Sequence, residues 1–155
     1  MKYSRLTKEQ FEELHQEFIN FLATQSVTAD EWENLKVNKP ELAETELDVF
    51  SDLIWEGALN KAKYLEHISP QHMYLFHLDE DKMHAIVINL KNDIDITTKE
   101  GYNWLRDNLM DENVEFLQAD KDYTDDKNLD KFKMIEQGAV ITKGELYNYF
   151  DKLIN

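Results

Sequence analysis

The spacing of apolar residues predicts several amphipathic helices, and capping boxes indicate where four of them begin. In each box a Thr is followed three residues later by Glu or Gln, so that side chains satisfy the free N–H groups of a helix start. The four boxes are Thr7/Gln10, Thr28/Glu31, Thr97/Glu100 and Thr142/Glu145. They predict helices over about residues 8–24, 29–37, 98–109 and 143–153.

Two further helices are expected from Pro and Gly. Pro40 suits the first turn of a helix, because its missing N–H would have no partner there. The apolar pattern continues that helix to about residue 66 or 67, before Ser69-Pro70 stops it. Gly138 is expected to end a helix over about residues 128–137.

The stretch HMYLFHLDEDKMHAIVINL (72–90) predicts a β-hairpin, because β-branched, aromatic and aliphatic residues flank an acidic turn. One face would carry Met73, Leu75, Ile86 and Ile88; the other would carry Tyr74, Phe76, Leu78, Ala85 and Val87. Both faces are apolar, so helices should cover both sides of the sheet. Residues 114–119 predict a third strand; if it ran parallel to the second, a right-handed crossover would connect them. The order ααα-ββ-α-β-αα predicts a mostly helical single α+β domain over residues 1–155, with a small sheet built on the hairpin.

Composition narrows the class of protein. The chain has no cysteine, which favours a cytoplasmic protein stabilised by packing. No apolar run approaches the roughly 20 residues that a membrane-spanning helix needs, so we expect no membrane association. With 17 basic and 32 acidic residues the net charge is −15, which disfavours direct binding to nucleic acid. No glycine-rich phosphate loop or nucleophile motif occurs, and we expect no cofactor and no catalytic residue.

Two histidines flank the acidic turn of the hairpin and could bind a metal ion. If the turn is centred between Glu80 and Asp81, His77 faces His84 across the strands, and Asp79 or Asp81 could supply a third ligand. A register shifted by half a residue would place the histidines on opposite faces. The alternative is a hairpin whose last pair lies at the solvent boundary, where histidine is ordinary.

An acidic stripe runs along the helix that begins at Pro40. Its acids recur every four residues, at Glu44, Asp48, Asp52 and Glu56. Trp55 and Leu59 fall among them and could anchor a partner interface with a charged rim. The alternative is that another part of the same chain covers Trp55 and Leu59, because a helix that is apolar on several sides is usually buried.

Three stretches resemble a family of small, acidic, functionally uncharacterised bacterial proteins. They are MKYSRLTKEQFEEL (1–14), LDVFSDLIWEGALNKAKYLEHIS (47–69) and GAVITKGELYNYF (138–150). The resemblance implies a bacterial cytoplasmic protein and supplies no catalytic residues.

These patterns favour a non-enzymatic acidic protein-binding module, an adaptor or a subunit of a larger assembly, that docks on a basic partner surface. The docking surface would be the acidic stripe with Trp55 and Leu59, or the acidic region 107–130. The alternative function is a metal-binding protein or metal-dependent enzyme that uses His77, His84 and Asp79.

Overall fold

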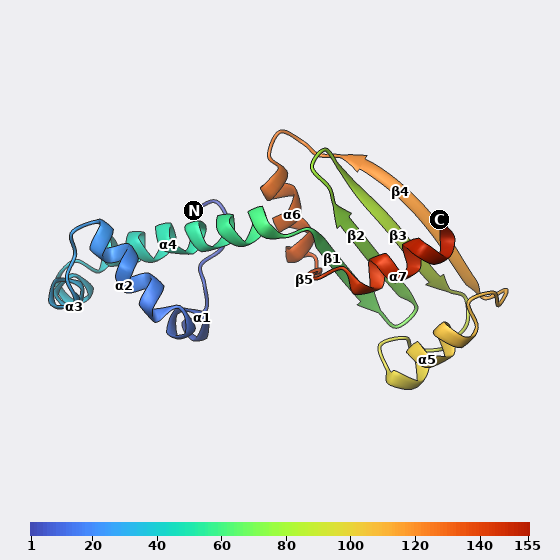
Figure 1. Ribbon diagram of the computed structural model, residues 1–155. Helices are drawn as coiled ribbons and strands as arrows, with labels where there is room; N and C mark the ends of the chain where they lie inside the picture. Colours follow the sequence, from blue (N-terminus) through green and yellow to red (C-terminus); the bar gives the residue numbers. More distant parts are fainter. The chain divides into compact units, whose positions relative to one another are not determined.

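The protein has an α+β fold, as predicted. The computed structural model describes residues 1–155 and contains seven helices and a five-stranded antiparallel sheet (Figure 1). The chain divides into two compact units, Met1–Asn60 and Lys61–Asn155, a division that the hydrophobic pattern did not reveal. None of the helices has the length and apolarity needed to cross a bilayer.

The first unit consists of four helices. They are α1 (Lys8–Glu13), α2 (His15–Thr24), α3 (Ala29–Asn38) and α4 (Pro40–Lys61). The predicted caps at Thr7 and Thr28 are confirmed, because each hydroxyl accepts a hydrogen bond from the backbone N–H three residues later. The start of α4 at Pro40 is confirmed as well.

The predicted helix over residues 8–24 is interrupted at Leu14, whose φ of −100° and ψ of 23° separate α1 from α2. The rings of Phe11 and Phe18, one on each side of the break, both pack on Phe50, with centroids 5.9 and 5.0 Å from that of Phe50. The core of this unit is formed by Leu6, Phe18, Leu22 and Phe50.

The second unit is built on the sheet, whose strands follow the spatial order β4-β3-β2-β1-β5. They are β1 (Tyr64–Ser69), β2 (His72–Leu78), β3 (Lys82–Leu90), β4 (Val114–Asp122) and β5 (Val140–Thr142). The predicted hairpin is β2–β3, and the predicted third strand is β4, which is longer than expected and runs antiparallel to β3. No parallel crossover is therefore needed.

The prediction that the helix from Pro40 continues to residue 66 or 67 is wrong. The helix ends at Lys61, and residues 64–69 form β1, which pairs antiparallel with β2. Ser69 pairs with His72, so Pro70 and Gln71 form a two-residue turn between the strands. Pro70, expected to stop a helix, joins two strands instead.

Two of the four predicted caps are also wrong. Thr98, not Thr97, caps α5 (Lys99–Asp107), because Thr97 hydrogen-bonds to the Asp95 carboxylate through its N–H and its hydroxyl. Thr142 is the last residue of β5, and Gly144 precedes α7 (Glu145–Ile154) in the left-handed conformation with φ of 82°. A residue at Gly144 needs φ > 0, which glycine adopts without steric cost.

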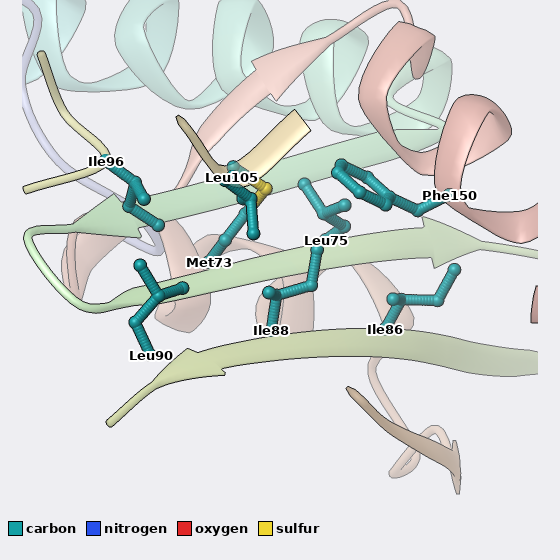
Figure 2. Packing of buried hydrophobic residues seen from close by; sticks show 8 residues of the cluster. All are labelled: Met73, Leu75, Ile86, Ile88, Leu90, Ile96, Leu105 and Phe150. Atoms are coloured by element: carbon teal, nitrogen blue, oxygen red, sulfur yellow. The ribbon is translucent and has the colours of Figure 1, made fainter. Parts of the chain in front are cut away.

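Helices pack on both faces of the sheet, as predicted. On one face, α5 and α7 cover the predicted set Met73, Leu75, Ile86 and Ile88, joined by Ile96, Leu105 and Phe150; Figure 2 shows these side chains together with Leu90. On the other face, α6 (Lys127–Glu136) packs Met134 and Ile135 against Leu65, Leu78 and Met83. The helix that Gly138 was expected to end is α6, and Gly138 has φ of 116° just after it.

Candidate metal centre

The register of the hairpin places the two histidines opposite each other. Phe76 pairs with Ala85, His77 with His84 and Leu78 with Met83, the pairing expected for a turn centred between Glu80 and Asp81. The His77 and His84 ring centroids lie 5.7 Å apart. Both side chains are half-buried, on the sheet face that α7 covers. The condition on which the metal hypothesis depended is therefore met.

Asp79 lies in the turn and completes a group of three potential ligands. Its N–H donates to the carbonyl of Lys82 at 3.0 Å, which closes the turn, and its Oδ1 accepts from the N–H of Glu80 at 2.8 Å. That backbone hydrogen bond is the main reason why the pKa of Asp79 lies below its usual value. One ligand atom each from His77, Asp79 and His84 lie within 4.8 Å of one another.

Asp120 holds the ring of His84 from the other side. Its Oδ1 lies 2.6 Å from Nδ1 of His84, while Nε2 of His84 lies 3.5 Å from Oδ2 of Asp79. The hydrogen bond to Asp120 is the largest cause of a raised His84 pKa, with a smaller contribution from Asp79. A carboxylate on one ring nitrogen fixes the tautomer and leaves the other nitrogen free for a metal, an arrangement common among metal-binding histidines.

Two tyrosines hold the ring of His77. Tyr64, its cross-strand neighbour on β1, stacks on it with 4.8 Å between centroids and 14° between planes. Tyr147 of α7 lies 5.5 Å from His77 and 5.8 Å from Tyr64, again between centroids. Burial is the main cause of a raised pKa at Tyr147, and the nearby carboxylates of Asp151 and Asp120 raise it further. The neutral phenol is therefore the form present beside His77 at neutral pH.

The geometry suits a small transition-metal ion. Ligands about 2.0–2.1 Å from a tetrahedral ion lie roughly 3.3 Å apart, close to the 3.5 Å between His84 Nε2 and Asp79 Oδ2. All three ligand atoms lie within 4.8 Å of one another, and Asp79, the exposed member of the group, is the side chain free to rotate toward the two histidines. Two imidazoles and one carboxylate form a three-ligand set, and the sites that use three protein ligands keep a position for water or substrate.

The acidic stripe on α4 binds residues of its own chain. The guanidinium of Arg5 donates to the carboxylates of Glu44 and Asp48, at 2.7 Å from Nη2 to Oδ1 of Asp48. These contacts, with Asp48 the larger cause, raise the pKa of Arg5. Arg5 therefore neutralises part of the charge that was expected to face a partner.

The other two acids of the stripe contact the same N-terminal segment. The carboxylate of Asp52 accepts from the backbone N–H groups of Lys2 and Tyr3 at 2.7 and 2.9 Å. The carboxylate of Glu56 accepts from the Tyr3 hydroxyl and lies 3.8 Å from the ammonium of Lys2. The stripe thus serves as a binding surface for residues 2–5.

Neither of the two expected apolar anchors, Trp55 and Leu59, is fully exposed. Leu59 has no exposed surface, and Trp55 is half-buried against the cluster formed by Leu6, Phe18, Leu22 and Phe50. In the acidic region 107–130, Asp120 is the residue that reaches the histidine group.

Three residues of the candidate site were missed in the sequence: Tyr64, Asp120 and Tyr147. Tyr64 was expected inside the helix that begins at Pro40, and Tyr147 lies in the helix predicted over about residues 143–153 but was given no role. Asp120 lay one residue beyond the predicted third strand. The available signal was the β3–β4 register, in which His84 pairs with Asp120, but it depends on an antiparallel arrangement that the sequence left open.

Comparison with known proteins identifies the family but supplies no function. No curated protein and no solved structure matches the chain. The expected resemblance to a family of unknown function is confirmed over the full length. The family model described as "Family of unknown function (DUF6495)" matches residues 1–155, and the chain therefore belongs to that family.

Proposed function

We propose that the protein binds one divalent transition-metal ion through His77, Asp79 and His84. The observation that carries the proposal is the cross-strand histidine pair with Asp79, whose ligand atoms lie within 4.8 Å of one another. The imidazole-rich set favours zinc, nickel, cobalt or copper over magnesium or calcium, which prefer oxygen ligands. A three-ligand set with an open position is compatible with both a metal-binding protein and a metal-dependent enzyme.

Proton competition gives the proposed site a pH dependence. A metal ligand must be neutral imidazole, whereas Asp120 and Asp79 favour the protonated form of His84. Metal affinity should therefore rise with pH through the pKa of His84. Once the ion is bound, the carboxylates of Asp79 and Asp120 offset the cost of deprotonating His84, because they also attract the positive charge of the ion.

Isothermal titration of the untagged full-length chain with Zn²⁺ tests this proposal. We expect one equivalent to bind, and His77→Gln or His84→Gln to weaken binding by at least about 10-fold, since even outer partners of metal ligands account for about 10–100-fold. The matched control is His72→Gln, which changes a histidine of the same strand on the opposite face. Less than about a tenth of an equivalent of zinc, or an equal loss in the His72 variant, contradicts the proposal.

A second candidate function is docking of the first unit on a protein with a basic surface, as an adaptor or subunit would. It is favoured by an exposed apolar row on α4, formed by Leu42, Val49 and Leu53. Spacings of seven and four residues place these side chains along one line of a helix. Residues 1–60 carry 5 basic and 13 acidic residues, a net charge of 5 − 13 = −8, which complements a basic partner.

This docking surface differs from the one expected from the sequence. Asp52 is unsuitable as a probe, because it accepts hydrogen bonds from the backbone of residues 2 and 3. Leu53→Lys reverses the character of the apolar row and adds one unit of positive charge. The control Glu13→Lys, at an exposed position of α1, adds two units, so it tests the effect of charge alone more severely. If docking uses α4, a partner captured from cell extract is lost with Leu53→Lys and kept with Glu13→Lys. Retention of every partner by the Leu53 variant removes α4 as the docking surface.

A further inference from the structure

A cavity of about 450 Å³ lies on the sheet face opposite the histidine group, between α6 and the strands. Its apolar lining comes from Phe76, Met83, Ala85, Ala119, Met134 and Ala139. Polar side chains at its rim include Lys121, Asp130, Lys133 and Gln137. Pockets that bind small molecules have volumes of about 300–1,000 Å³ with a mostly apolar lining and a few polar groups.

The hollow follows from the strand register. Ala85 of β3 pairs directly with Ala119 of β4, so two minimal side chains face each other on this side of the sheet. The neighbouring position on β2 is Phe76, whose ring runs nearly parallel to that of Tyr74, at 9° and 6.4 Å between centroids. A cross-strand alanine pair beside an aromatic ring leaves space above this part of the sheet, where the cavity lies.

The acidic side chains at the rim already have hydrogen-bond partners, whereas the two lysines have no ion-pair partner. Asp130 accepts hydrogen bonds from the N–H and the hydroxyl of Thr124, both at 2.7 Å, and Asp120 is held by His84. Lys121 and Lys133 form no ion pair, although the chain carries almost twice as many acidic as basic residues. Two unpaired ammonium groups beside an apolar floor match a ligand with an anionic group and an apolar body.

We propose that this cavity binds a small apolar carboxylate, with its flat body on the floor formed by Phe76, Ala85 and Ala119 and its carboxylate at the rim with Lys121 and Lys133. The proposal does not rest on the metal proposal: Asp120 lies at the rim of the cavity as well as beside His84, but none of the residues that would contact the ligand is a proposed metal ligand. The ring of Phe76 offers a face on which an aromatic body can stack, which favours an aromatic ring over a branched aliphatic body.

Binding of 2-naphthoate, compared with the neutral, isosteric 2-naphthamide, tests the proposal in the full-length chain. A ligand of this size should have a Kd on the order of 1 mM, which suits chemical-shift titration of ¹⁵N-labelled protein. We expect saturable shifts at residues 85, 119, 133 and 137. The carboxylate should bind about 3- to 10-fold more tightly than the amide, since each screened charge contact accounts for about 1.5- to 5-fold.

Two variants and a control for each separate the contributions. The double variant Lys121→Gln/Lys133→Gln should remove the preference for the carboxylate, whereas Lys152→Gln, which changes an exposed lysine on α7, should keep it. Ala119→Leu should fill the hollow and abolish binding of both probes, whereas Ala23→Leu, at an exposed position of α2, should not. Equal binding of carboxylate and amide, an unchanged preference in the double lysine variant, or shifts confined to other residues each overturns the proposal.

Discussion

Replacing Gly144 by alanine should destabilise the second unit and disturb the histidine group together. Gly144 has φ of 82°, and a Cβ at this position would lie 2.5 Å from Cγ and Cδ2 of the Tyr64 ring. The left-handed conformation costs a residue with a Cβ about 1–2 kcal/mol, and overpacking of a close-packed site about 1–3 kcal/mol. The sum is a loss of about 2–5 kcal/mol in the free energy of unfolding. Tyr64 must also move, and its ring is the one that stacks on His77.

Urea unfolding followed by far-ultraviolet circular dichroism measures the loss of stability, and the ring-proton shifts of His77 report whether the stack with Tyr64 persists. Gly57→Ala is the matched control: no atom lies within 4 Å of the added Cβ, and Gly57 lies inside α4. Alanine there should stabilise the helix by about 0.5–1 kcal/mol and leave His77 unchanged.

The loss of stability and the change in the His77 shifts both follow from the contact between the added Cβ at position 144 and the ring of Tyr64, but each measurement tests a different claim. A loss below about 0.5 kcal/mol, within the range of ordinary surface substitutions, would refute the assigned backbone conformation and packing. A large loss with unchanged His77 shifts would refute the claim that Tyr64 positions His77, while leaving the backbone argument intact.

Three further predictions concern single side chains. Ser51→Ala should cost about 1–3 kcal/mol in urea unfolding, because the buried Ser51 hydroxyl accepts from the N–H of Leu6 at 3.1 Å, and the variant leaves that donor unpaired. Asp120→Asn should lower the pKa of His84 in an NMR titration. The raised pKa of His84 in the folded protein stabilises it fully below the unfolded value of about 6.5, and this contribution is lost as pH rises through the folded value, so the variant should lose stability mainly at acidic pH. Phe150→Ala should cost about 3–5 kcal/mol in urea unfolding, because its ring is fully buried.

The hairpin could be predicted from the apolar and β-branched runs on both sides of the acidic turn. These runs predicted the two strands and the side chains on each face, but they left the centre of the turn open by half a residue. The His77–His84 pairing was therefore one of two possible registers, and the structure has that one. A two-residue periodicity has little freedom once the turn is placed, since a slip of one residue moves every side chain to the other face.

Strand β1 escaped prediction because its residues suit a helix equally well. Residues 62–67 follow a long helical stripe without a glycine or a capping signal, and the chain leaves the helix only after Lys61. What decides the conformation is pairing with β2, a contact that local spacing does not encode. The capping error at Thr142 has the same origin, because β5 is a strand only through its pairing with β1.

The acidic stripe shows how charge along a helix can be met by contacts within the same chain. Carboxylates at four-residue spacing repel one another by about 0.2–0.5 kcal/mol per pair in an isolated helix, which favoured an external partner of opposite charge. In the folded unit, the partner is the N-terminal segment, where Arg5 and two backbone N–H groups meet three of these acids. Sequence separation of about 40–50 residues hides such a contact from pattern analysis.

The histidine pairing is imposed by the core and does not depend on an ion. Met73, Leu75, Ile86 and Ile88 each expose 1% or less of their surface on the face that carries both histidines. A register slip of one residue would move these side chains to the opposite face, where Tyr74 and Leu117 are exposed. The cost would be at most about 1.5–3 kcal/mol each, or about 6–12 kcal/mol together. That cost is comparable to the whole stability of a typical domain, about 5–15 kcal/mol. The group formed by His77, Asp79 and His84 is therefore assembled without an ion. Cross-strand NMR contacts between His77 and His84 should be present in chelator-treated protein, and, if the proposed site binds zinc, zinc should change side-chain rotamers without altering the strand register.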